Sequence, residues 1–136
     1  MINFNYETDF NLDAENEISK WITNTIASEN YKLEEINYVF CDDEYLHKLN
    51  VEFLDHDTLT DIISFDYSIG KLIQGDIFIS VERVIDNANE YSVPFEEEIK
   101  RVIIHGVLHY CGYKDKSDEE AKIMREKENF YLKQFK

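Results

Sequence analysis

In four short stretches of the chain the apolar positions follow the pattern of β-strands, either alternating with polar residues or forming a compact apolar run. These stretches are Ile2–Tyr6, Ile36–Cys41, Ile62–Phe65 and Asp76–Ser80. Before the last of them, the segment Ile69–Gly75 contains two glycines and predicts a turn or hairpin. We therefore expect four strands before residue 81.

Apolar residues three and four positions apart predict helices between these strands and after them. The first runs from Asp13 to about Glu29, with one stripe formed by Ile18, Trp21, Ile22, Thr25 and Ile26. Asp42 or Asp43 can cap a second, which carries Tyr45, Leu46, Leu49 and Phe53. Ser80 can cap a third, which carries Val81, Val84, Ile85 and Ala88.

Two more helices are predicted in the C-terminal part of the chain. Pro94 stands where one begins, and Glu96–Glu98 favour its positive N-terminal end. Its continuation Val102–Tyr110 is apolar nearly all round, which is typical of a central, buried helix. Ser117 and Glu120 form a capping-box pattern that opens the last helix, whose packing positions are Ala121, Met124, Phe130 and Leu132. We expect an α+β fold: a roughly four-stranded mixed sheet packed by about five helices, with the Val102–Tyr110 helix at its centre.

Length and composition indicate one domain, residues 1–136. The chain has four glycines and one proline and contains no low-complexity tract that could serve as a linker. Its start resembles no leader peptide, and no run approaches the roughly 18 apolar residues of a membrane span, so a cytoplasmic protein is expected. Cys41 and Cys111 form no C-x-x-C pair and are expected to be reduced, partly buried thiols.

The net charge of −15 ordinarily argues against a polyanionic partner. The charge is unevenly distributed: residues 1–99 hold 5 basic and 23 acidic side chains, whereas residues 100–136 hold 9 basic and 6 acidic ones. Positive charge therefore collects in the segment that also holds His105 and His109. This distribution permits an anionic substrate without requiring one.

His105 and His109 are four residues apart on the predicted central helix, so both imidazoles project from one face, within reach of one ion. Gly112 can end that helix in a left-handed conformation and return Asp115 toward the histidines. Two nitrogens and a carboxylate oxygen suit one zinc ion. Three protein ligands leave a fourth position for water, which favours a catalytic site and hydrolysis by an activated water.

Simpler interpretations exist for these residues. The histidines could be core side chains satisfied by hydrogen bonds, with Asp115 capping the last helix. Gly106 follows His105, so the H-E-x-x-H motif of zinc proteases is absent and ordinary proteolysis is disfavoured. Gly106 itself could permit close approach of a strand or helix, or leave room for substrate.

The segment His105–Asp115, H-G-V-L-H-Y-C-G-Y-K-D, resembles the H-G-x-L-H-x-x-G-Y-D-H signature of the YbeY family of metal-dependent endoribonucleases. Thr60–Phe65 is similar to that family's T-D-V-L-S-F block, and Gly75–Ser80 to its G-D-I-x-I-S block. The resemblance implies an α+β fold, a three-ligand zinc site and cleavage of single-stranded RNA. It further implies a role in maturing the 3′ end of small-subunit (16S) ribosomal RNA and in ribosome quality control. Ribosomal RNA and the ribosome are then the expected partners, with no DNA and no membrane.

The chain departs from the family pattern at two places. Lys114 and Asp115 stand where the family usually has Asp-His, so the third ligand is a carboxylate, which should raise the pKa of a metal-bound water. Leu54 stands where the family usually has an arginine, so no phosphate-binding arginine can be inferred there. The catalytic residue is thus unknown. Lys114 and Asp61 are candidates, the first for phosphate binding and the second as a base or an acceptor near the metal. A structural role is the simpler interpretation of Asp61, which could bind backbone amides at the end of a strand.

Further cations that could bind phosphate are Lys71, Arg101 and Lys116, although surface solubility is the simpler explanation for each of them. His47 and His56 have no partner at ligand spacing and are expected to be surface histidines. Two other functions stay open. One is a zinc-dependent peptide or amide hydrolase, because the H-x-x-x-H-x-x-G-x-x-D spacing also looks like that of metzincin-type proteases. The other is a zinc-stabilised, ribosome-associated binding module.

Overall fold

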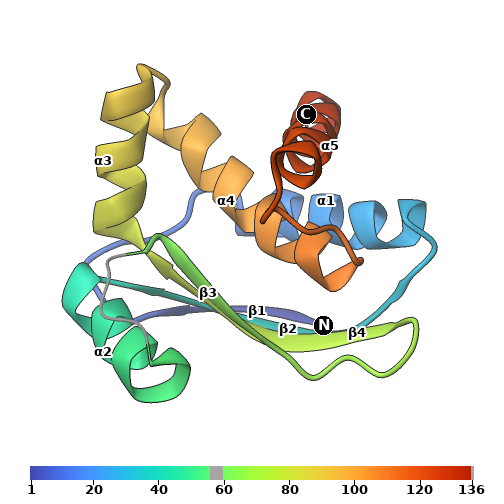
Figure 1. Cartoon of the computed structure of the whole chain (residues 1–136), viewed down its shortest axis with the longest axis horizontal. Helices are drawn as coiled ribbons and strands as arrows, with labels where there is room; N and C mark the ends of the chain where they lie inside the picture. Colours follow the sequence, from blue (N-terminus) through green and yellow to red (C-terminus); the bar gives the residue numbers. More distant parts are fainter. Residues whose placement is uncertain (56–59, 136) are drawn as a thin grey trace.

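The fold is built on one mixed β-sheet, seen in a computed structural model that describes residues 1–55 and 60–135 (Figure 1). Its strands are β1 (Ile2–Tyr6), β2 (Lys32–Cys41), β3 (Ile62–Asp66) and β4 (Leu72–Ser80). They lie in the order β1-β2-β4-β3. The first three in this order are parallel, and β3 pairs antiparallel with β4 at the edge. The predicted four-stranded mixed sheet is confirmed.

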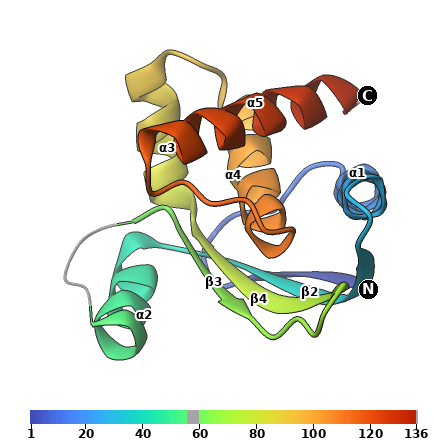
Figure 2. The ribbon, with the colours of Figure 1, turned by 45° about the vertical axis from the view of Figure 1, so that its right-hand side comes forward.

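Helices cover both faces of the sheet. They are α1 (Glu15–Ser28), α2 (Asp43–Leu54), α3 (Val81–Tyr91), α4 (Phe95–Tyr110) and α5 (Asp118–Gln134). Figures 1 and 2 show α2 on one side of the sheet and the other four helices on the opposite side. The predicted α+β class is therefore confirmed. Among the described residues, no helix combines the length and the apolar character needed to cross a membrane.

Three helix starts have the caps that the sequence predicts. The side chain of Asp42 accepts a hydrogen bond from the backbone N–H of Tyr45 at 2.9 Å, and that of Ser80 accepts one from Arg83 at 3.2 Å. Ser117 and Glu120 form both halves of a capping box. The first helix differs from the prediction, because it begins at Glu15, after a left-handed residue at Ala14, instead of at Asp13.

Two apolar cores lie on the two faces of the sheet. In the larger one, β2 and β4 side chains pack against α1, α4 and α5, and the stripe predicted for α1 is fully buried. In the smaller one, Leu46 of α2 packs against Cys41 and Ile63. Five apolar positions predicted on the helix faces are exposed instead: Tyr45 (38%), Phe53 (63%), Ile85 (44%), Phe130 (52%) and Ala121.

The predicted turn before the last strand is shorter than expected. Gly75 lies inside β4, where it pairs with Ile36 of β2, and the strand already begins at Leu72. The glycine is needed there because the side chain of Tyr110, from α4, lies against the strand at this point. The Tyr110 hydroxyl donates a hydrogen bond to the carbonyl of Phe65 at 2.9 Å. A close approach of α4, and not a turn, explains this glycine.

Gly106 has the same purpose on the helix side of this contact. A Cβ atom there would lie 3.0 Å from Cδ1 of Ile77 and 3.1 Å from Cδ1 of Ile62. The glycine therefore lets α4 lie close to the sheet, which favours the structural interpretation of this residue over room for substrate. Helix α4 is buried along most of its length, as predicted, and it carries His105 and His109 on its remaining side.

The two cysteines are both buried and unpaired, which agrees with the expectation of reduced thiols. Burial raises the pKa of each thiol to about 12. Neither side chain therefore has the thiolate character that a nucleophile or metal ligand requires.

Candidate metal centre

His109 is oriented by the chain that follows its own helix. Its Nδ1 atom lies 3.0 Å from the backbone carbonyl of Tyr113. Because a carbonyl can only accept a hydrogen bond, Nδ1 carries the proton, and Nε2 of the neutral ring keeps its lone pair. That lone pair points to the opposite side of the ring, toward His105.

His105 is oriented by a carboxylate from another helix. Its Nδ1 atom lies 2.6 Å from Oε2 of Glu128 in α5, and Arg101 binds the other carboxylate oxygen at 3.0 Å. The Glu128 side chain is only 5% exposed. A buried carboxylate in this position accepts a hydrogen bond from Nδ1–H and leaves Nε2 of the neutral ring as an acceptor.

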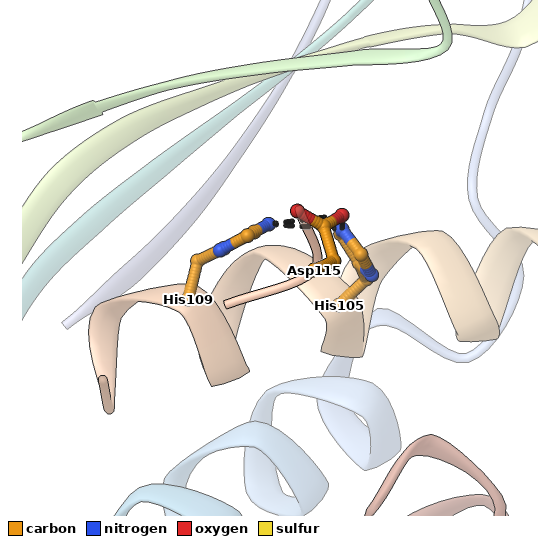
Figure 3. Close-up of side chains that lie close together, drawn as sticks. All are labelled: His105, His109 and Asp115. Atoms are coloured by element: carbon orange, nitrogen blue, oxygen red, sulfur yellow. Dashed lines mark hydrogen bonds and ion pairs between the residues drawn. The ribbon is translucent and has the colours of Figure 1, made fainter. Parts of the chain in front are cut away.

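Asp115 is brought to the histidines by the turn at Gly112, whose φ of 98° is in the left-handed region predicted for it. Its Oδ2 atom lies 3.2 Å from Nε2 of His105 and 3.6 Å from Nε2 of His109. The two Nε2 atoms are themselves 3.0 Å apart. Figure 3 shows the three side chains converging on one point beside α4.

This convergence suits a cation. In the neutral tautomers set by their outer partners, two nitrogen lone pairs and a carboxylate oxygen face one another with no proton between them, an arrangement that is repulsive without a positive charge. Among residues 1–55 and 60–135, this is the one group of three His, Cys, Asp or Glu side chains whose donor atoms all lie within 4.8 Å. Two imidazoles and a carboxylate are ordinary ligands of a divalent metal such as zinc.

The ionisation of the site follows from its partners. Burial lowers the pKa of His105, but the hydrogen bond and charge of Glu128 outweigh burial, so the pKa is raised overall. Burial and the neighbouring His105 lower the pKa of His109. Although burial raises the pKa of Glu128, its bonds to His105 and Arg101 lower it overall and keep the carboxylate charged.

A cavity of about 300 Å³ adjoins the centre, between α3, α4, α5 and the start of β3. His105 and Asp115 belong to its wall, as do Asp61 and Arg101. Asp61, a candidate from the sequence, is therefore next to the centre, and burial raises the pKa of its carboxyl. Its side chain accepts a hydrogen bond from Asn87 at 3.4 Å.

The other candidates that lie among the described residues do not line this cavity. Lys114 is exposed and lines a separate surface depression with Tyr113 and Glu120. Leu54 is the last residue of α2 and is 42% exposed. The Nζ atom of Lys71 lies 4.1 Å from the ring centroid of Tyr31. Lys116 is exposed in the loop before α5, His47 lies in α2, and His56 falls outside the described residues.

The sequence analysis missed two acidic residues at the site, Glu128 and Glu98. Glu128 lies on the buried stripe of α5 between Met124 and Tyr131, so an acidic residue at a core position was the available signal. Glu98 was assigned to the helix N-terminus together with Glu97, although it faces inward and only 6% of it is exposed.

Comparison with known proteins extends over the whole chain. The family model for Endoribonuclease YbeY matches residues 2–136. Proteins named endoribonuclease YbeY from Flavobacterium johnsoniae and Flavobacterium psychrophilum are 64% and 60% identical over 135 residues, 99% of this chain and 97% and 96% of theirs. A relative of the same name from Bacteroides thetaiotaomicron is 46% identical over 113 residues, 83% of this chain and 82% of its own.

The fold agrees with these relationships. The solution structure of the Thermotoga maritima protein TM1509 is similar, with a TM-score of 0.71 at 25% sequence identity, and the match covers 99% of this chain and 89% of that one. The similarity thus includes the sheet, the helices and the segment that carries His105, His109 and Asp115. The chain belongs to the YbeY endoribonuclease family.

Proposed function

We propose that this protein is a zinc-dependent endoribonuclease that cleaves single-stranded RNA, with His105, His109 and Asp115 as the zinc ligands. The observation that carries the proposal is the convergence of the two Nε2 atoms and Oδ2 of Asp115 at 3.0–3.6 Å. The family, whose members named above are endoribonucleases, supports RNA as the substrate.

Three protein ligands leave room for water or substrate on the metal. When bound there, zinc polarises a phosphoryl oxygen and lowers the pKa of water. Two hydrogen bonds within the chain orient the histidine ligands. Glu128 binds Nδ1 of His105, and the carbonyl of Tyr113 binds Nδ1 of His109. Asp61, in the same cavity, is the candidate to accept a proton from the attacking water.

The biological substrate in this proposal is the 3′ end of small-subunit (16S) ribosomal RNA, with a role in ribosome quality control. A ribosomal substrate would place the protein in the cytoplasm and make the ribosome its partner. The net positive charge of residues 100–136, which include α5 and most of α4, supports an anionic substrate in an otherwise acidic chain.

The test is cleavage of a single-stranded RNA that spans a small-subunit rRNA 3′ end. Zinc-loaded protein, chelator-treated protein and the His109→Ala variant are compared after the bound metal has been quantified. His47→Ala, in α2, is the matched control. Cleavage that requires both zinc and His109 supports the proposal. Bound zinc without RNA cleavage would instead favour a binding module or a hydrolase of another substrate. Duplex RNA is the control for the preference for single strands.

A further inference from the structure

Glu98 is a buried carboxyl group that the metal centre does not use. It lies on α4 seven residues before His105, and therefore on the same side of the helix. It is 6% exposed, and across the described residues no hydrogen bond or ion pair reaches its side chain. Burial raises the pKa of this carboxyl. Arg101 and Arg125 attract its charge without forming an ion pair with it, and its carboxyl group opens to the neighbouring cavity, where it is available to bind a ligand that donates hydrogen bonds.

The space in front of Glu98 is the cavity of about 300 Å³ that adjoins the metal centre. A second carboxyl group, that of Asp61, lines it from the start of β3. Its apolar wall is formed by Ile62, Val102 and Met124. Tyr91 of α3 also borders the cavity, and it is 59% exposed. Most of the remaining lining is charged or polar, so the cavity suits a polar ligand that has an apolar face.

Resting on the endoribonuclease function proposed above, we propose that this cavity binds one nucleobase of the RNA and prefers a base with an exocyclic amino group over uracil. The carboxyl group of Glu98 is a hydrogen-bond acceptor when ionised, so it selects N–H donors, whereas Asp61 keeps the role proposed for it beside the metal. Adenine and cytosine offer an amino group on their pairing edge. Uracil has a carbonyl oxygen at that position, and its single N3–H donor lies between two carbonyl oxygens that a carboxylate repels. The apolar wall contacts the face of the base, and Tyr91 is placed to stack on it.

The position of the cavity fits this assignment. His105 and Asp115 line it as well as the metal centre, so a phosphodiester at the metal would place an adjacent nucleoside at the cavity. A hydrated cation is the other ligand that two acids could attract. The volume is about ten times the roughly 30 Å³ of one water, and a hydrated ion would make no use of Val102 and Met124. The positive charge of Arg101, which also lines the cavity, disfavours the binding of a cation there in addition to the metal.

The experiment measures binding of AMP, CMP and UMP to the full-length, zinc-loaded protein by calorimetry or NMR titration. AMP and CMP are expected to bind about tenfold more tightly than UMP. Glu98→Gln should bring this ratio close to one, because an amide presents both a donor and an acceptor. Glu97→Gln removes the same charge from the exposed side of α4 and should leave the ratio unchanged.

Equal affinity of wild-type protein for the three nucleotides, or no measurable binding, would overturn the proposal without any variant. If a Glu98→Gln protein that still unfolds cooperatively kept the wild-type preference for AMP and CMP over UMP, Glu98 would not be the residue that selects the base. Titration with Mg²⁺ alone tests the cation: Glu98-dependent Mg²⁺ binding without nucleotide preference would make the cavity a metal site and refute base binding. Selective nucleotide binding without RNA cleavage would instead leave the subsite standing and contradict the proposed nuclease activity.

Discussion

Glu128 and His105 come from different helices, and their Oε2 and Nδ1 atoms lie 2.6 Å apart. The same carboxylate binds Arg101, one turn earlier on α4, at 3.0 Å. Through this one side chain, α5 determines the ring orientation of a candidate ligand that α4 carries. Docking of the last helix and the geometry of the metal centre are therefore coupled.

Removal of Glu128 should weaken metal binding. Glu128→Ala leaves Nδ1 of His105 without its acceptor and frees the ring, so we expect zinc affinity to fall by about 10–100-fold. Glu128→Gln keeps an acceptor oxygen and should lose less. Affinity is measured by competition with a chromophoric chelator. Glu126→Ala, an exposed position on the same helix, is the control, and equal affinity in Glu128→Ala and wild type would contradict the coupling.

The convergence of the three candidate ligands could be predicted from the sequence because it depends on local geometry. Helical periodicity places His105 and His109 on one face, and a glycine after a helix turns the chain back, so Asp115 follows within a few residues. All three predicted residues meet in the structure. The order of strands and helices was predictable for the same reason, since each depends on a repeat of apolar positions within one segment.

The outer partners could not be predicted, because they depend on how distant segments pack. Glu128 reaches His105 only after α5 has docked on α4, and no local pattern contains that contact. Gly75 looked like a turn residue because a single sequence does not show that Tyr110, 35 positions away, would lie against it. A buried acid such as Glu98 looks the same as its exposed neighbours when three glutamates follow one another.

Asp115, the proposed third ligand, can be tested separately from the histidines. Asp115→Ala removes an oxygen that lies 3.2 Å from Nε2 of His105, and its effect on zinc affinity should exceed the roughly 10–100-fold loss typical of an outer partner. Asp115→His supplies a nitrogen donor in its place and should retain zinc. Asp118→Ala, an exposed position that follows, is the matched control. Bound zinc is counted after gel filtration, and full occupancy in Asp115→Ala would exclude Asp115 as a ligand.

Two glycines where α4 meets the sheet should respond differently to alanine. In Gly75→Ala the new Cβ would collide with the Tyr110 side chain and the Phe65 carbonyl, so a loss of about 1–3 kcal/mol in the free energy of unfolding is expected. In Gly106→Ala the new contacts are the ends of flexible isoleucines, and alanine favours a helix by up to about 1 kcal/mol. Urea unfolding in chelator compares them; a larger loss in Gly106→Ala would show that the helix side is the tighter one.

Glu29, at the end of α1, connects that helix to the loop and helix around the metal centre. Its carboxylate accepts hydrogen bonds from the hydroxyls of Tyr113, at 2.7 Å, and Tyr131, and Lys127 lies 3.3 Å away. Burial raises the pKa of Glu29, but these partners outweigh it and lower the pKa below its ordinary 4.5. The folded state therefore binds this proton less readily than the unfolded state. The resulting stability is present above pH 4.5 and is lost as the pH falls through the folded-state pKa.

Glu29→Gln should thus cost about 1–3 kcal/mol of the free energy of unfolding at pH 7, because a neutral amide replaces a charged acceptor of three donors. The difference from wild type should shrink as the pH is lowered below 4.5, because Glu29 of the unfolded wild-type protein then takes up a proton that the folded state binds less readily. Urea unfolding of the metal-free protein at pH 7 and pH 4 measures both values, with Glu17→Gln on the exposed side of α1 as control. A gap that stays constant between these pH values would mean that Glu29 stabilises the fold by shape and not by charge.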